Sequence, residues 1–123
     1  MTRLTFGAAI LLASTLSACA RAPTYEPQIE NGNAASGKLA MRRLQCNVCH
    51  TIPGIGGTQG MVGPPLRQYR RNVYVAGKFP NTANYLVQWI ANPPALSPDT
   101  AMPALGVSRD DARDIAAYLY SLD

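Results

Sequence analysis

The stretch Cys46-Asn47-Val48-Cys49-His50 is the most informative part of the sequence, because it places two thiols and an imidazole within five residues. Cys46 and Cys49 stand three positions apart, so a single helical turn brings both sulfurs to one side. His50 is the single histidine of the 123-residue chain, so no other imidazole competes with it. The stretch therefore predicts a site where two thiols and one imidazole act together.

The spacing C-x-x-C-H is the attachment signature of haem c. The two thiols add to the two vinyl groups of the porphyrin, and the adjacent His50 then lies under the iron as its proximal ligand. We therefore expect one covalent haem, with its iron, at Cys46 and Cys49.

Three other interpretations of the same stretch fit less well. A structural zinc site needs four ligands, usually in two pairs, whereas only three adjacent candidates exist here. A thioredoxin-type dithiol needs a βαβ context, and the sequence shows none. A plain disulfide would make the neighbouring His50 a coincidence.

The first eighteen residues have the pattern of a signal peptide. Arg3 precedes an apolar run, Leu4 to Leu16, that is shorter than the roughly 20 residues of a transmembrane helix. Leu16-Ser17-Ala18-Cys19 resembles the lipobox of bacterial lipoproteins, whose cysteine becomes the lipidated first residue of the mature protein. The resemblance implies a lipid anchor at Cys19 on the periplasmic side of a bacterial membrane. The alternatives are an ordinary cleaved signal and a core helix.

Residues 20–36 are polar, contain two prolines and show no helical or strand period. We predict that residues 19–36 comprise the lipidated cysteine and a flexible tether, with an r.m.s. span of roughly 20–25 Å. The alternative is that this segment packs on the domain surface. The remaining residues, 37–123, form the predicted domain.

Three helices are predicted within this domain. The first runs from about Ser36 to Leu44 and the second from about Thr82 to Ala91, where Asn92 precedes a proline. The third begins after Ser108. The buried positions expected from the helical period are Leu39, Ala40, Met41, Leu44, Leu86, Trp89, Ile90, Ala112, Ile115, Ala116, Leu119 and Leu122.

The start of the third helix has the strongest local signal. Ser108 and Asp111 form a capping box, and Asp110 and Asp111 suit the positive end of the helix dipole. The intervening segments, 51–66 and 91–103, are predicted loops, because five glycines and three prolines occur in the first and four prolines in the second. No β period is evident. Loops of this length fit a small domain if they surround a large apolar cofactor.

From Gly37 to Leu122 the chain resembles the class I cytochrome c family. The attachment motif is followed by Gly63-Pro64, later by Met102-Pro103, and the chain closes with DIAAYLYSL. The resemblance implies a small all-α cytochrome c fold, with about three to four helices and long Gly- and Pro-rich loops around one haem. It also implies a contact between the first and last helices at Gly37, Met41 and Tyr118.

Met102 is the candidate for the distal iron ligand, because it lies in a loop before the last helix as in the family. Met41 lies on the first helix, where methionine usually fills the core. Met61 lies only eleven residues after His50, in the loop expected to stay on the proximal side. A thioether ligand raises the reduction potential relative to two imidazoles.

Three further residues are candidates for positions around the cofactor. Pro64 is expected to offer its backbone carbonyl to the free ring nitrogen of His50, which would orient the imidazole. Tyr74 and Trp89 are candidates for hydrogen bonds to haem propionates or to the methionine sulfur, and otherwise line the pocket as buried aromatics.

The formal net charge is +4, and the segment 31–98 contains seven Lys or Arg residues and no acid. This excess is too mild and too dispersed to predict nucleic-acid binding. Arg67, Arg70, Arg71 and Lys78 could neutralise propionates, form a docking rim for an acidic redox partner, or simply be solvated.

The sequence thus predicts a membrane-tethered electron carrier that passes single electrons between redox proteins and acts on no small-molecule substrate. Two alternatives remain open. One is an enzyme or gas sensor with a five-coordinate haem. The other is a fixed electron-transfer subunit of an oxidase or dehydrogenase complex.

Overall fold

The structure, a computed structural model, describes residues 28–58 and 60–122. The expected signal peptide, Cys19 and most of the expected tether lie outside these residues. The elements in chain order are α1 (Ala34–Arg43), the short 3-10 turns η1 (Cys46–Val48) and η2 (Tyr69–Arg71), strands β1 (Tyr74–Val75) and β2 (Phe79–Pro80), α2 (Ala83–Ala91), α3 (Pro93–Leu96) and α4 (Arg109–Tyr120).

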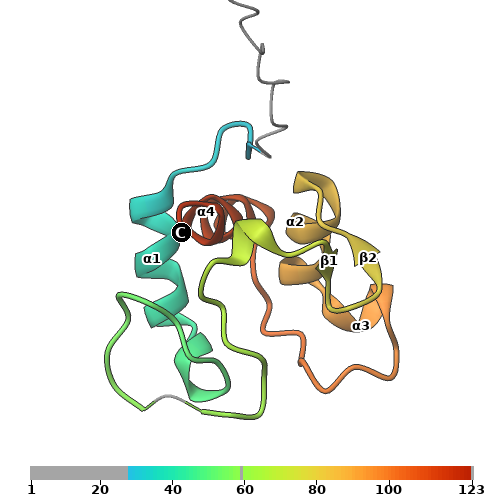
Figure 1. Ribbon diagram of the computed structural model, residues 1–123, viewed down its shortest axis with the longest axis horizontal. Helices are drawn as coiled ribbons and strands as arrows, with labels where there is room; N and C mark the ends of the chain where they lie inside the picture. The colour runs from blue at the N-terminus through green and yellow to red at the C-terminus, as the bar shows by residue number, and fades with distance from the viewer. Residues whose placement is uncertain (1–27, 59, 123) are drawn as a thin grey trace, which may run out of the picture.

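Helices α1 and α4 cross closely, with α2 against α4 on the far side from α1 (Figure 1). Gly37 makes the crossing possible, because a Cβ there would lie 1.9 Å from the backbone oxygen of Asp114. Beside it, Met41 is buried, and the Tyr118 hydroxyl donates a 2.5 Å hydrogen bond to the Pro53 carbonyl. The contact expected between the first and last helices is therefore present.

The first helix begins at Ala34, two residues earlier than predicted. The side chain of Asn33 accepts a hydrogen bond from the Ser36 amide at 2.9 Å and caps the helix. The Asn33 amide in turn donates to Asp114 on α4 at 2.8 Å, and Ile29 packs against the core. The described end of the expected tether, residues 28–36, therefore lies on the domain surface.

Leu39 was expected in the core but is 61 % exposed, so this prediction is wrong. The face of α1 that meets α4 is set by Gly37, and Ala40 and Met41 share it. Leu39 lies two positions from Gly37, about 200° around the helix, and so points to solvent. Leu44 is only partly buried.

The second helix matches its prediction: Thr82 caps α2 through the Tyr85 amide, and the helix ends before Asn92. Leu86, Trp89 and Ile90 are all buried. One feature was not predicted. The expected loop 91–103 contains the single turn α3, which begins with two prolines whose fixed φ suits the first turn of a helix.

Helix α4 begins as predicted. Ser108 accepts a hydrogen bond from the Asp111 amide at 3.0 Å. The Asp111 carboxylate pairs with Arg43 of α1 at 2.8 Å, and this hydrogen bond, followed by that from Ser108, lowers the pKa of Asp111. The buried face comprises Ala112, Ile115, Ala116, Tyr118, Leu119 and Tyr120, while Leu122 is partly buried.

Strands β1 and β2 pair antiparallel, with Tyr74 opposite Pro80 and Val75 opposite Phe79. Neither strand was predicted, because each has only two residues, too few to show an alternating period. Ala76 and Gly77 adopt left-handed backbone angles in the connecting turn (φ 52° and 68°). The fold stays predominantly helical, as expected.

Among the residues described, none of the helices has the length and apolar character needed to cross a membrane.

Candidate cofactor site

The Cys46–His50 segment folds as one tight turn at the end of α1. Gln45 adopts a left-handed conformation (φ 55°) that ends the first helix and starts η1. The His50 amide then donates to the Cys46 carbonyl at 3.0 Å, which closes a helical turn around the motif. Cys46 and Cys49 are both half-buried, and burial raises the pKa of the Cys46 thiol.

The glycine-rich loop that follows folds back and runs alongside this turn in the same direction. The Gly63 amide donates to the Cys49 carbonyl at 2.9 Å, and the Leu66 amide donates to the Thr51 carbonyl at 2.9 Å. These bonds bring Gly63 against the ring of His50. A Cβ at this glycine would lie 2.3–2.8 Å from three ring atoms, so only glycine fits.

The next residue orients the imidazole. Nδ1 of His50 lies 2.8 Å from the Pro64 carbonyl oxygen. Because a carbonyl only accepts, Nδ1 carries the proton, and in the neutral ring Nε2 keeps its lone pair for a metal. The predicted contact between Pro64 and His50 is present, and it has the form in which a proximal histidine is usually held.

A cavity of about 780 Å³ opens beside this histidine. This volume lies within the range of sites for cofactors, about 300–1,000 Å³. Most of its wall is apolar, and the residues that line it include Met41, Cys46, Cys49, His50, Pro64, Leu66, Tyr74, Leu86, Trp89, Ile90, Met102 and Leu119. The structure thus brings the candidate attachment, ligand and aromatic residues to one cavity, namely Cys46, Cys49, His50, Pro64, Tyr74, Trp89 and Met102.

The three methionines of the described chain differ in position. Met102 is half-buried and lines the cavity, and its amide is fixed by the Thr100 hydroxyl at 3.1 Å. Met41 also reaches the cavity wall but is fully buried in the core. Met61 is 93 % exposed and does not line the cavity. Met102 and His50 are therefore the pair best placed for an enclosed metal.

Comparison with known proteins agrees with this geometry. A family model described as cytochrome c matches residues 34–123. The chain belongs to the cytochrome c family. Members hold haem c covalently, and Cys46, Cys49 and His50 supply the attachment motif in this cytochrome.

A curated relative extends the comparison. The chain is 31 % identical over 90 residues to cytochrome c oxidase subunit 2 of Alkalihalophilus pseudofirmus. The match covers 72 % of this chain but 25 % of that protein, so the cytochrome spans about a quarter of the relative's length.

The residues of this cytochrome fit haem well. The wall is apolar, the two thiols lie in one turn, and Gly63 leaves room only for the His50 ring. Within the described ranges, no three His, Cys, Asp or Glu side chains gather into a group that could itself hold a metal ion. The cavity wall does offer one imidazole, from His50, and one thioether, from Met102, and both are ligand types that haem iron accepts.

The two candidate aromatics of the cytochrome differ in burial. Trp89 is buried and packs near Phe79, with 6.3 Å between ring centroids, while Tyr74 of β1 is mostly exposed. Both line the cavity. Their predicted hydrogen bonds to the cofactor or the methionine sulfur stay predictions.

The four candidate cations separate into two groups. Arg67, Arg70 and Arg71 lie in or beside η2 and do not line the cavity. Lys78, at the end of the hairpin turn, does line it, and it donates a 2.7 Å hydrogen bond to Ser97. Ser97 was missed in the sequence, because nothing in its neighbourhood indicates that the hairpin reaches it.

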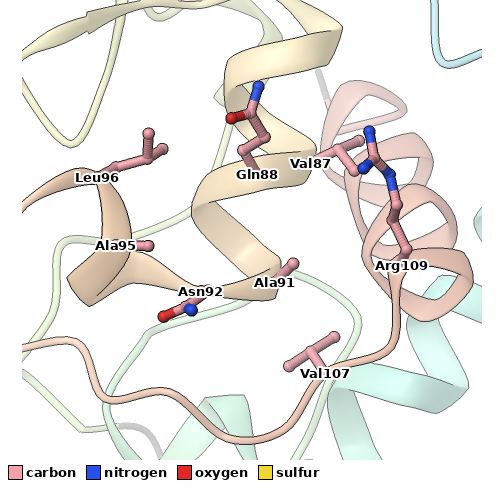
Figure 2. Close-up of a pocket in the computed structure, with 8 residues that line it drawn as sticks. All are labelled: Val87, Gln88, Ala91, Asn92, Ala95, Leu96, Val107 and Arg109. Atoms are coloured by element: carbon pink, nitrogen blue, oxygen red, sulfur yellow. The ribbon is translucent and has the colours of Figure 1, made fainter.

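A second hollow of about 350 Å³ lies between α2, α3 and the start of α4 (Figure 2). Arg109 reaches from α4 toward Val87 on α2, and Val107 lies below. None of the predicted site residues lines this hollow. The chemistry of the cytochrome therefore belongs to the larger cavity.

Proposed function

We propose that this cytochrome c domain carries single electrons through a covalent haem whose iron His50 and Met102 would both hold. The observation that carries the proposal is the placement of both side chains on one largely apolar cavity beside the attachment turn. The Pro64 carbonyl supports the proximal role of His50, since it fixes the ring at 2.8 Å.

The bound haem iron supplies a one-electron couple. The protein contributes the rest. His50 is held in one tautomer by Pro64, and Met102 offers a neutral, soft sulfur that favours the reduced state. The apolar wall keeps water away and lowers the polarity around the iron. Iron held by both His50 and Met102 would have no open position for a substrate.

The five-coordinate enzyme or sensor differs from this proposal only at Met102. The fixed subunit of an oxidase or dehydrogenase complex is supported by a separate observation, the 31 % identity to part of an oxidase subunit 2. The domain would transfer electrons in the same way whether it is a tethered carrier or a fixed subunit of a complex. The candidates differ in what holds the domain near its partner.

Replacing Met102 with Ala tests the ligation. We expect haem to stay attached, the ferric protein to become high spin, and the far-red absorption band of sulfur ligation to vanish. The reduction potential should fall by on the order of 0.1–0.3 V, within the span of about 0.8 V that axial ligands set. Optical spectroscopy and potentiometry measure these changes.

Met61→Ala is the matched control, because Met61 is 93 % exposed and lies outside the cavity. Its spectrum and potential should equal those of the wild type. A Met102→Ala protein that keeps the far-red band would contradict the proposed ligation.

We further propose that a lipid on Cys19 anchors the mature protein at the periplasmic side of a bacterial membrane. The support is the lipobox-like Leu16-Ser17-Ala18-Cys19. Several acyl chains together hold a protein stably, whereas one alone does so marginally. Mass spectrometry of the mature N-terminus should show an acylated Cys19. An unmodified Cys19 in the soluble fraction would refute the anchor.

The redox partner is proposed to dock through acidic groups. Arg67, beside η2, and Arg71, within it, are exposed, and residues 31–98 contain no acidic residue. Opposite charges on two proteins speed their encounter, and the effect weakens as salt rises.

A further inference from the structure

We propose that Lys78, positioned by Ser97, binds a propionate carboxylate of the haem. The inference rests on haem attachment at Cys46 and Cys49, and it assigns a site that the attachment motif does not include. Four cations were candidates from sequence, and the structure separates one of them from the rest.

The first support is the local structure that holds Lys78. Ala76 and Gly77 form a tight left-handed turn, and the Lys78 amide donates to the Val75 carbonyl at 3.0 Å. Asn81, which follows the hairpin, ties its two ends together, because its side-chain amide donates to the Asn72 carbonyl at 2.8 Å. Lys78 therefore leaves a rigid turn rather than a free loop.

The second support is the polar partner of Lys78. Its ammonium donates to the hydroxyl of Ser97 at 2.7 Å. Ser97 is only 5 % exposed and lies at the end of α3, where its amide donates to the Pro93 carbonyl at 3.0 Å. The hydroxyl thus directs a long, flexible side chain along the cavity wall. It occupies one of the three ammonium protons and leaves two for another acceptor.

The third support is charge. Among the described residues that line the cavity, Lys78 is the only lysine or arginine. No described carboxylate lies within ion-pair distance of it. Asp99 lines the same cavity and adds a negative charge near Ser97. A carboxylate entering here therefore needs the positive charge of Lys78 for stabilisation.

The fourth support is the position of the hairpin relative to the attachment turn. In Figure 1 the Cys46–His50 segment lies in the green coil below α1, whereas β1 and β2 lie on the opposite side of the molecule. Haem carries its two propionates on the edge opposite its two vinyl-derived thioethers. Because Cys46, Cys49 and Lys78 line the same cavity, the carboxylates of a haem attached at the cysteines would lie toward the hairpin and Lys78.

Replacing Lys78 with Gln tests the assignment, because Gln keeps a donor but removes the charge. A positive charge beside the haem disfavours its oxidised form, which carries one more positive charge than the reduced form. We expect the reduction equilibrium constant to fall threefold to tenfold, a decrease of about 30–60 mV in potential. The propionate bending mode in the resonance Raman spectrum should shift as well. Lys78→Arg should restore both values.

The other lysine of the chain, Lys38, supplies the matched control. The sequence contains only Lys38 and Lys78, and Lys38 lies on α1 over the Tyr118 ring, outside the cavity. Lys38→Gln removes the same charge and should leave the potential and the propionate mode unchanged. Equal shifts in the two variants, or an unmoved propionate mode in Lys78→Gln, would overturn the assignment.

Lys78 could instead pair with Asp99, and a double-mutant cycle distinguishes this pairing from one with a haem propionate. With a propionate as partner, Lys78→Gln shifts the propionate mode equally with and without Asp99→Asn. If that shift disappears in the Asp99→Asn background, it arises through Asp99 and the proposal is wrong. Covalent haem staining and the low-spin spectrum of the wild type report separately on the proposed function.

Discussion

Replacing Cys46 and Cys49 together with Ala is expected to abolish covalent haem completely. Both thiols lie in one helical turn at the cavity, and each supplies one thioether. Without them nothing fixes the cofactor during unfolding, so haem leaves the chain when it is denatured. Haem staining after denaturing, reducing electrophoresis measures this loss, in cells that express a cytochrome c maturation system.

Two comparisons make this result specific. Cys46→Ala alone leaves one thioether, so haem staining should persist at reduced yield. Cys19→Ala removes a cysteine outside the attachment motif and should leave the stain intact. A double variant that still retains haem through denaturation would contradict the attachment site.

Gly63→Ala should have the second largest effect. The new Cβ would lie 2.3–2.8 Å from the His50 ring, whereas ordinary contacts begin near 3.4 Å. The ring must move, and it then loses the 2.8 Å bond to Pro64. We expect a loss of about 1–3 kcal/mol in the free energy of unfolding, the usual cost of overpacking. We also expect a mixed-spin haem spectrum, because the partner that orients the ligand is lost.

Gly56→Ala is the control for Gly63→Ala. A Cβ at Gly56 would meet no atom within 4 Å, although the residue lies in the same loop. Its stability and spectrum should match those of the wild type, as measured by thermal unfolding and optical absorption. If both glycine variants behave alike, the close packing of Gly63 on His50 contributes neither to stability nor to the haem spectrum.

Much of the fold was predictable because its signals are local. Ser108 and Thr82 cap their helices through their own neighbouring amides, and the prolines in the loops restrict the backbone directly. The haem attachment motif was predictable for a similar reason, since C-x-x-C-H brings all its groups together within five residues. In each case the interacting groups lie within a few residues of one another along the sequence.

The features that the sequence did not predict depend on contacts between distant segments. Leu39 looks like a core residue, but Gly37 decides which face of α1 meets α4. The pairing of Lys78 with Ser97 joins residues nineteen positions apart, and it depends on a hairpin too short to show a β period. The fit of Gly63 against His50 likewise appears only when the loop folds back.

The most direct test of the electron-carrier function is the absorption spectrum of the reduced, full-length protein before and after exposure to carbon monoxide. If His50 and Met102 both bind the iron as proposed, the spectrum should stay low spin and unchanged at neutral pH. An immediate shift of the main absorption band would reveal an open position on the iron. That result would contradict the proposed electron carrier and favour a five-coordinate enzyme or gas sensor.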